Sequence, residues 1–258
     1  MTKILFLGNG PLADSVLNVL QKHYDIVFHA RTKTDLDTVK KLKENHPELH
    51  AILASYGIII PQDVLELFEP EGIINIHPSK LPEYRGPSPI ESAILNGATD
   101  FSVSIMKLTK DMDAGDLYYQ ETLHNLPLDK SIIYQKLSEA GAKWLINNLD
   151  NLPIPVKQDH KKATYTHKFT KTDGQIDPNR ETSTQIYRKI VAFQGFPKVK
   201  YPFYGQNCII LTAHPMEQGD TAPIVLKCAN SSKLAIDCLQ PEGKRPMDAK
   251  SFLNGYKK

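Results

Sequence analysis

The stretch KILFLGNGPLADSVLNVL, residues 3–20, predicts the order of the first structural elements. Its apolar run ends at Gly8, and beyond the Gly-Asn-Gly-Pro turn the apolar residues recur at helical spacing. A strand followed by a tight turn and a helix is typical of the start of an α/β fold with a largely parallel sheet.

The same turn matches a glycine-rich fingerprint, because Gly8, Gly10 and Ala13 stand at the spacing of dinucleotide-binding folds. The acidic residue that would hold a ribose hydroxyl is absent near the end of the second strand, where the sequence reads FHARTK. Arg31 would suit a 2′-phosphate instead, which leaves an NADP-dependent dehydrogenase as an alternative. A lone motif of this kind favours a turn for close helix–strand packing over a cofactor site.

Further along, strand patterns alternate with helix patterns. Strands are expected at residues 25–30, 50–60, 72–77, 102–108 and 116–122, and helices at 35–45, 61–67, 90–95 and 130–149. This alternation predicts an open, doubly wound, mostly parallel sheet covered on both faces, a Rossmann-like domain over residues 1–162.

The amino-acid composition changes at residues 151–180, which are rich in Pro, Lys, Thr and Asp and show no regular spacing of apolar residues. We expect a linker at 163–180 and a second domain at 181–258. That domain has one helical pattern at 183–193 and short strand patterns at 201–204, 207–213, 222–228 and 233–239. A small β-barrel of the OB type is the predicted architecture.

Bulk properties are those of an ordinary globular protein, with 41% apolar residues and a net charge of +2 over 258 residues. No apolar run is long enough for a membrane span, so we expect a cytoplasmic protein. The three cysteines are widely spaced and suggest core residues rather than a metal site. Residues 1–162 carry 17 Lys and Arg against 21 Asp and Glu, whereas residues 163–258 carry 14 against 8, so the C-terminal part is basic. A basic domain suits an anionic partner, although chance drift also explains such a balance.

Polar side chains mark the end of the strand at residues 72–77. Asn75 and His77 are two residues apart and therefore face the same side of the sheet, and they stand near the carboxyl end of the strand. Ligands of open α/β sheets bind beyond this end. The four prolines at 78–89 would stiffen the loop that follows, so the pair favours a reaction centre over two separate loop caps.

This loop carries a resemblance. NIHPSKLPEYRGPSPIESAILNG, residues 75–97, resembles the signature N-x-H-x-S-L-L-P-x-x-R-G-x-x-P-I of the folate-dependent formyltransferases, and TKDMDAGDLYYQ, residues 109–120, resembles the segment L-D-x-G-D of that family. The later segments, including KFTKTDGQIDPNR and LQPEGKRPMDAKSFLNG, resemble in order the members that act on methionyl-tRNA.

The resemblance implies Asn75, His77 and Asp113 as catalytic residues and 10-formyltetrahydrofolate as the formyl donor, with no metal. It implies initiator methionyl-tRNA as the partner, with neither a membrane nor an obligate protein partner. The residues implied at the folate site are Tyr56, Gly57, Ile58, Ile59, Ile60, Ser79, Lys80, Leu81, Pro82, Lys110, Asp111 and Met112. The candidates for contact with tRNA are Arg31, Lys33, Arg85, Gly86, Lys244 and Arg245.

Two features depart from the family pattern. The segment after the second strand is short and lacks the long basic loop that relatives use to enter the acceptor stem of tRNA, so only a reduced patch of Arg31, Lys33, Lys40, Lys41 and Lys43 is available there. Lys80 stands where the family has leucine.

Alternatives to a tRNA formyltransferase are a formyltransferase acting on a sugar nucleotide or purine intermediate, a formyl-folate hydrolase, and a non-catalytic RNA-binding module. The NADP-dependent dehydrogenase ranks below all of these.

Overall fold

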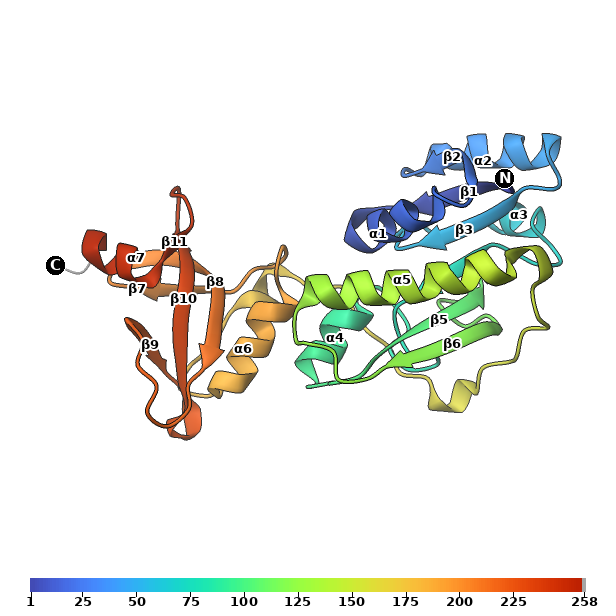
Figure 1. The fold of residues 1–258 in the computed structure, drawn as a ribbon. Coiled ribbons are helices and arrows are strands. Elements are labelled where there is room, and N and C mark those ends of the chain that lie inside the picture. The colour runs from blue at the N-terminus through green and yellow to red at the C-terminus, as the bar shows by residue number, and fades with distance from the viewer. Residues whose placement is uncertain (257–258) are drawn as a thin grey trace. The chain divides into compact units, whose positions relative to one another are not determined.

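A computed structural model describes residues 1–256 and divides the chain into two compact units. The first comprises Met1–Ile90 and Thr99–His167, and the second comprises Glu91–Ala98 and the chain from Lys168 onward. The ribbon is drawn in Figure 1.

The first unit contains a six-stranded sheet with the order β2-β1-β3-β4-β5-β6. Its strands are β1 (Lys3–Gly8), β2 (Asp25–Ala30), β3 (His50–Ala54), β4 (Ile74–His77), β5 (Phe101–Lys107) and β6 (Leu117–Leu123). The pairings from β2 to β4 are parallel, and β5 and β6 are added antiparallel. This confirms the predicted Rossmann-like, mostly parallel sheet.

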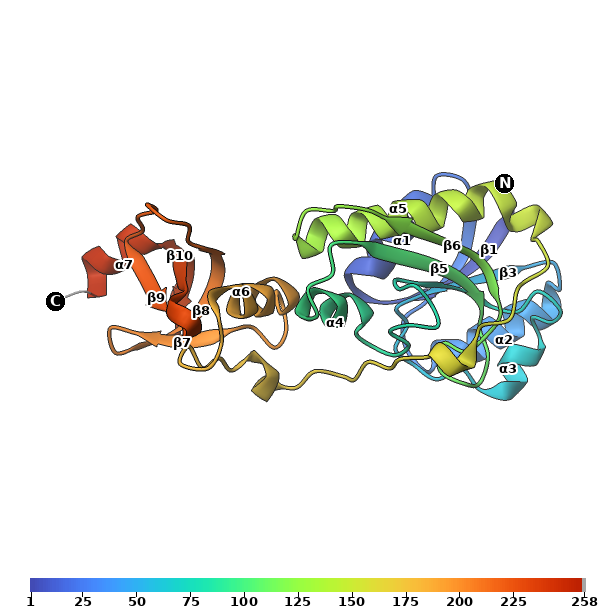
Figure 2. The ribbon, with the colours of Figure 1, turned by 90° about the horizontal axis from the view of Figure 1, so that it is seen from below.

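Helices cover both faces of this sheet, as Figure 2 shows for α1 and α5 on one side and α2 and α3 on the other. The helices that begin in the first unit are α1 (Gly10–Leu20), α2 (Asp35–Asn45), α3 (Gln62–Glu66), α4 (Pro89–Leu95) and α5 (Lys130–Asn148), with 3-10 turns η1 (Leu149–Asn151) and η2 (His160–Lys162). Alternation along β1 serves both faces: Leu5 and Leu7 join the core with α2 and α3, so Ile4 and Phe6 point to the other side.

The glycine-rich turn has a packing explanation. A Cβ added to Gly8 would come within 2.4 Å of the Ala54 carbonyl oxygen and 2.8 Å of the Ala13 side chain. Gly10 has a φ of +83°, which favours glycine. The spacing Gly8, Gly10, Ala13 therefore lets α1 start close to β1 and β3.

One strand is shorter than its sequence pattern predicts. The apolar run 50–60 forms a strand only as far as Ala54, because Ser55 adopts a left-handed conformation with a φ of 52°. The three isoleucines after Gly57 therefore belong to a loop.

The second unit contains the five-stranded antiparallel sheet predicted as OB-like, curled into a half-barrel. Its strands are β7 (Lys200–Phe203), β8 (Gln206–Pro215), β9 (Ile224–Lys227), β10 (Lys233–Pro241) and β11 (Met247–Asp248), and its helices are α6 (Ser183–Ala192) and α7 (Ala249–Tyr256), with 3-10 turns η3 (Lys171–Gly174) and η4 (Ala229–Ser231). Within residues 1–256 no strand pairing joins β7 to β9 or β11, so the sheet stays open. The sequence patterns did not predict β11 and α7. Across the described helices, none combines the length and apolar character that a membrane crossing requires.

Candidate functional site

Strand β4 brings Asn75 and His77 to the site. Both residues are 5% exposed. Their neighbour Ile76 faces α5, since it lies against Gly141 of that helix, and alternation therefore turns Asn75 and His77 to the opposite face of the sheet. This is the face that α2 and α3 partly cover, so the site lies outside the layer formed by α1 and α5.

Asp113 meets both side chains from the loop that follows β5. Its Oδ1 lies 3.6 Å from His77 Nδ1 and 3.5 Å from Asn75 Nδ2, and its Oδ2 accepts the Gly86 backbone N–H at 2.7 Å. The three side chains that the sequence singles out as catalytic candidates thus converge on one point, with Asp113 13% exposed.

A second contact fixes the orientation of the His77 ring. Nε2 lies 3.2 Å from the Tyr84 carbonyl oxygen, which can only accept, so Nε2 carries a proton. Nδ1 then faces the Asp113 carboxylate.

The loop after β4 is held by β5 and β6 as well as by its prolines. Ser104 Oγ donates to the Ser79 carbonyl oxygen at 2.6 Å and accepts the Leu81 N–H at 3.2 Å. Gln120 Nε2 donates to the Leu81 carbonyl oxygen at 2.9 Å, and Ser79 Oγ donates to the Glu83 carbonyl oxygen at 2.7 Å. Several backbone groups of this turn are therefore satisfied within the protein.

The residues implied at the folate site differ in accessibility. Tyr56 is buried and its hydroxyl donates to the Thr32 carbonyl oxygen, and burial raises the pKa of this phenol to about 12. Ile58 and Leu108 pack on the same hydrophobic core. Ile59 and Met112 are apolar yet 84% and 60% exposed on these loops. Of the other residues implied at this site, three are buried (Ile60, Ser79 and Leu81) and one is partly buried (Pro82). The remaining four are exposed (Gly57, Lys80, Lys110 and Asp111).

Arg85 is a predicted candidate for contact with tRNA, but its side chain has partners within the protein. Its side chain lies inside the protein, 2% exposed. Its guanidinium donates to Gln158 Oε1 at 2.7 and 3.2 Å, to His160 Nδ1 at 3.0 Å and to the Tyr165 hydroxyl at 3.4 Å. These internal bonds use four of the five N–H groups of the guanidinium. Gly86 is buried as well, with a φ of +112°.

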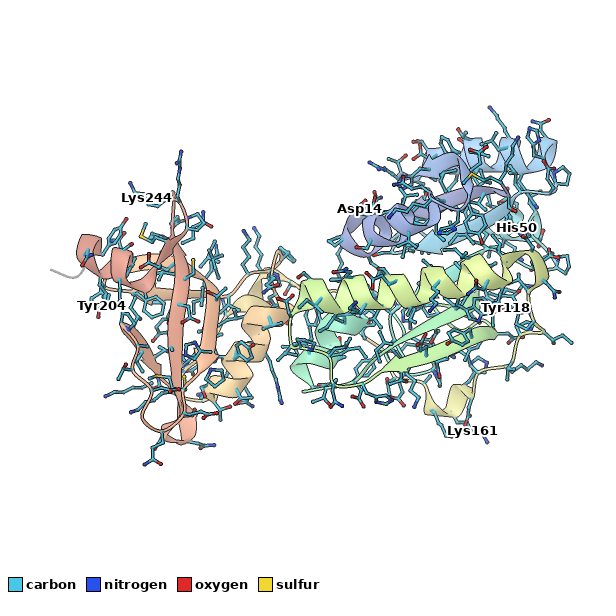
Figure 3. All side chains as sticks on the ribbon, viewed as in Figure 1. Asp14, His50, Tyr118, Lys161, Tyr204 and Lys244 are labelled. Atoms are coloured by element: carbon cyan, nitrogen blue, oxygen red, sulfur yellow. The ribbon has the colours of Figure 1, made fainter. Side chains whose placement is uncertain are left out.

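The remaining candidates for contact with tRNA are exposed. Arg31 and Lys33 lie in a short turn that Asp35 closes by accepting the backbone N–H of Arg31 and of Thr32, each at 2.7 Å. These two backbone hydrogen bonds hold the pKa of Asp35 below its ordinary value. Of the helix lysines nearby, Lys40 pairs with Asp63, and Lys43 donates to the Leu49 carbonyl oxygen. In the second unit, Lys244 and Arg245 are exposed between β10 and β11, and Figure 3 labels Lys244 at the tip of this hairpin.

Sequence reasoning missed the residues that support the site, above all Gln158. It is 5% exposed within a Pro- and Lys-rich stretch and donates to the backbone carbonyl oxygens of Asp113 and Gly115. A single glutamine among exposed charged residues gives no local signal. In residues 1–256 there is also no group of three or more His, Cys, Asp or Glu side chains arranged to hold a metal ion.

The fold and this site agree with a known class of enzyme. The formyl transferase family model matches residues 9–149, and the model of its C-terminal domain matches residues 168–257. The chain belongs to the formyl transferase family.

Relatives with established names include the methionyl-tRNA formyltransferase of Caldicellulosiruptor saccharolyticus, 34% identical over 92% of this chain and 80% of that protein. Among solved structures, methionyl-tRNA formyltransferase from Clostridium thermocellum has a TM-score of 0.69 at 20% identity, covering 93% of this chain and 99% of its own. HypX from Aquifex aeolicus in complex with tetrahydrofolic acid has a TM-score of 0.74 at 16% identity, and this chain covers 48% of that longer protein. At these identities the two structures support the fold alone.

Proposed function

We propose that this protein transfers the formyl group of 10-formyltetrahydrofolate to the α-amino group of methionine on initiator methionyl-tRNA. The observation that carries the proposal is the position of the Asp113 carboxylate, whose Oδ1 lies 3.5 Å from Asn75 Nδ2 and 3.6 Å from His77 Nδ1. Methionyl-tRNA is proposed as the acceptor because it is the substrate in the name of the relative that matches 92% of this chain at 34% identity.

The chemistry needs donors for an oxyanion. Attack of the amine nitrogen on the formyl carbon forms a C–N bond and a tetrahedral intermediate with negative charge on oxygen. The Asn75 amide has two N–H donors for this oxygen, and His77 would add its Nε2–H by releasing the Tyr84 carbonyl oxygen. Losing one such donor typically lowers the rate by about 10²–10³.

The chemistry also needs a path for one proton. An α-amino group has a pKa of about 7.7–8.0, so a useful fraction is neutral at working pH and no strong base is required. After attack, the ammonium proton must reach the folate nitrogen that leaves when its bond to the formyl carbon breaks. Asp113 orients His77 and can pass this proton on through water.

Folate would be held by the loops on either side of this centre. The proposed residues are Tyr56 to Ile60, Ser79 to Pro82, and Lys110 to Met112. Exposed Ile59 and Met112 offer apolar surface to a flat pterin, whereas the buried Tyr56 ring would act as support behind it. Lys80 is exposed and adds a positive charge at this edge.

The tRNA would be contacted through exposed positive side chains. Arg31 and Lys33 in the first unit and Lys244 and Arg245 in the second meet this condition. The net charge of +6 in residues 163–258 supports a phosphate-facing role for the second unit. With this substrate the protein would work in the compartment of translation, the cytoplasm.

The test is formyl transfer from 10-formyltetrahydrofolate to charged initiator tRNA, with elongator methionyl-tRNA and free methionine as controls. We expect N-formylmethionyl-tRNA from the initiator substrate. Formate release without any acceptor would identify a hydrolase instead. Transfer to amino sugars or purine intermediates but not to tRNA would move the protein to another branch of the family, and tRNA binding without turnover would leave a binding module.

A further inference from the structure

Gln158 connects the catalytic loop to a buried arginine. We propose that Gln158 is a positioning residue for formyl transfer, which acts by fixing the backbone of Asp113 and so the aim of its carboxylate. This inference rests on the proposed function of the site and adds a residue to it.

The Gln158 amide is fully used at this position. Its Nε2 donates to the carbonyl oxygens of Asp113 at 2.9 Å and Gly115 at 2.7 Å, while its Oε1 accepts two N–H groups of Arg85. The two donors and two lone pairs of a carboxamide are thus all paired, in a side chain 5% exposed. A buried amide with this many partners has a single orientation.

Gly86, the residue after Arg85, holds the other side of Asp113. Its backbone N–H donates to Asp113 Oδ2 at 2.7 Å. Asp113 is therefore held by two hydrogen bonds, one from Gly86 to its carboxylate and one from Gln158 to its backbone carbonyl oxygen. Arg85 in turn orients Gln158. Since both hydrogen bonds depend on the adjacent residues Arg85 and Gly86, these residues set the distance between the carboxylate and the face of β4.

The segment that carries Gln158 is itself fastened at both ends. Val156 and Leu117 exchange two backbone hydrogen bonds at 2.8 Å, and the Arg85 backbone pairs with Thr164 at 2.9 Å and Thr166 at 2.7 Å. In Figure 1 this segment is the yellow trace with the turn η2 below β6. Gln158 therefore lies between two backbone anchor points.

Small movements of this loop matter because the distances from Asp113 to Asn75 and His77 are already long for hydrogen bonds. Asp113 has a φ of 49°, a left-handed conformation that costs a non-glycine residue energy. Its Oδ1 is 3.5 Å from Asn75 Nδ2 and 3.6 Å from His77 Nδ1. Without Gln158 the loop can relax, and both distances change.

The test is a double-mutant cycle in the full-length protein. Gln158→Met keeps the side-chain length and removes all four hydrogen bonds, and it is made alone and in an Asp113→Ala background. Single-turnover rates and KM for both substrates are measured, with Gln135→Met on the exposed surface of α5 as the matched control. We expect kcat to fall roughly 10- to 100-fold with both KM values within about threefold, as for a misplaced catalytic group. In the Asp113→Ala background the same change should cost less than about threefold.

Full activity of Gln158→Met would overturn the inference. So would a double variant whose rate is reduced by the product of the two single-variant factors, or a rate reduction that only follows a lowered Tm. Where Gln158→Met fails to fold, Gln158→Glu keeps acceptors for Arg85 but removes both donors, and wild-type kcat in this variant contradicts the proposal.

Hydrogen exchange gives a readout that does not depend on the acceptor. Residues 109–116 should exchange faster in Gln158→Met while α5 is unchanged, and unaltered exchange in that loop would count against the inference. A wild-type protein that transfers no formyl group contradicts the proposed function, whereas active wild type with an equally active Gln158→Met contradicts only the positioning role.

Discussion

Asp113 shows at the scale of one residue how the sequence makes a reactive arrangement. The side chain lies on a loop rather than on the strand that carries Asn75 and His77, yet its carboxylate reaches both. The Gly86 N–H and the buried Gln158 keep it there. The geometry of this centre therefore depends on loop contacts that are distant in sequence.

Gly86→Ala tests one of these contacts. At a φ of +112° a Cβ would come within 2.8 Å of Thr166 Oγ1 and 2.9 Å of the Thr166 carbonyl oxygen. Gly195→Ala is the matched control, because its φ of +100° is similar and nothing lies within 4 Å of its Cβ. We expect Gly86→Ala to lower the free energy of unfolding by about 1–3 kcal/mol more than the control, through overpacking. Equal decreases in urea unfolding would show that Thr166 moves away freely.

Sequence reasoning succeeded at this scale where the signal was local. Asn75 and His77 could be paired from their spacing of two on a strand, whatever the rest of the chain does. The environment of Arg85 could not be predicted, since its partners Gln158, His160 and Tyr165 lie more than 70 residues away. Burial of a long polar side chain is decided by such distant partners.

At the scale of elements, most strands were predictable because they are short, largely apolar runs bounded by turn residues, whereas the two-residue strand β11 has no such pattern. The direction of β5 and β6 was not, because pairing direction depends on the connections and leaves no period in the sequence. The end of β3 depends on the left-handed backbone of Ser55, which the apolar run conceals. The hydrogen bonds from Ser104 and Gln120 to the loop after β4 could not be predicted either. Both are ordinary polar strand residues in the sequence, and their role depends on where that loop lies.

Helix α5 offers a test of an element's stability. Its N-cap Asp129 accepts hydrogen bonds from Ser131 Oγ and from the backbone N–H groups of Ser131 and Ile132, and the hydroxyl bond is foremost in holding the pKa of Asp129 below its ordinary value. Asp129→Ala should lower the free energy of unfolding at pH 7 by about 1 kcal/mol, the usual worth of an N-cap.

The pH dependence follows from the sign of this shift. A carboxyl whose pKa is lower in the folded state stabilises the fold above its unfolded pKa of about 3.9 and loses that effect as the pH falls through the folded value. Asp129→Asn keeps an acceptor for the cap but cannot titrate, so between pH 7 and pH 3 it should lose less stability than wild type. Parallel curves for the two proteins would contradict the assigned cause.

At the scale of the whole molecule, the charge is unevenly divided. Residues 1–162 have a net charge of −4 and residues 163–258 one of +6, so the reaction centre and the positive charge belong to different parts of the chain. Such a division suits a substrate with a small reacting end and a large anionic body.

Salt dependence measures this division. Affinity for methionyl-tRNA should fall steeply with salt, whereas KM for the folate should change little, because counterion release accompanies only the binding of phosphates. Lys244→Ala together with Arg245→Ala should reduce the slope of log K against log salt by about 1 for each phosphate that no longer meets a cation. Lys136→Ala, at a lysine already paired with Glu139, is the control and should leave the slope unchanged. A slope unaffected by the double change would remove this hairpin from the tRNA surface.

The most direct test of the account is the single-turnover rate of formyl transfer by Asn75→Ala with both substrates saturating. If the amide of Asn75 stabilises the oxyanion beside His77 and Asp113, a folded variant should transfer the formyl group about 10²–10³ times more slowly than wild type. A variant that melts like wild type and transfers at nearly the wild-type rate would contradict the central claim.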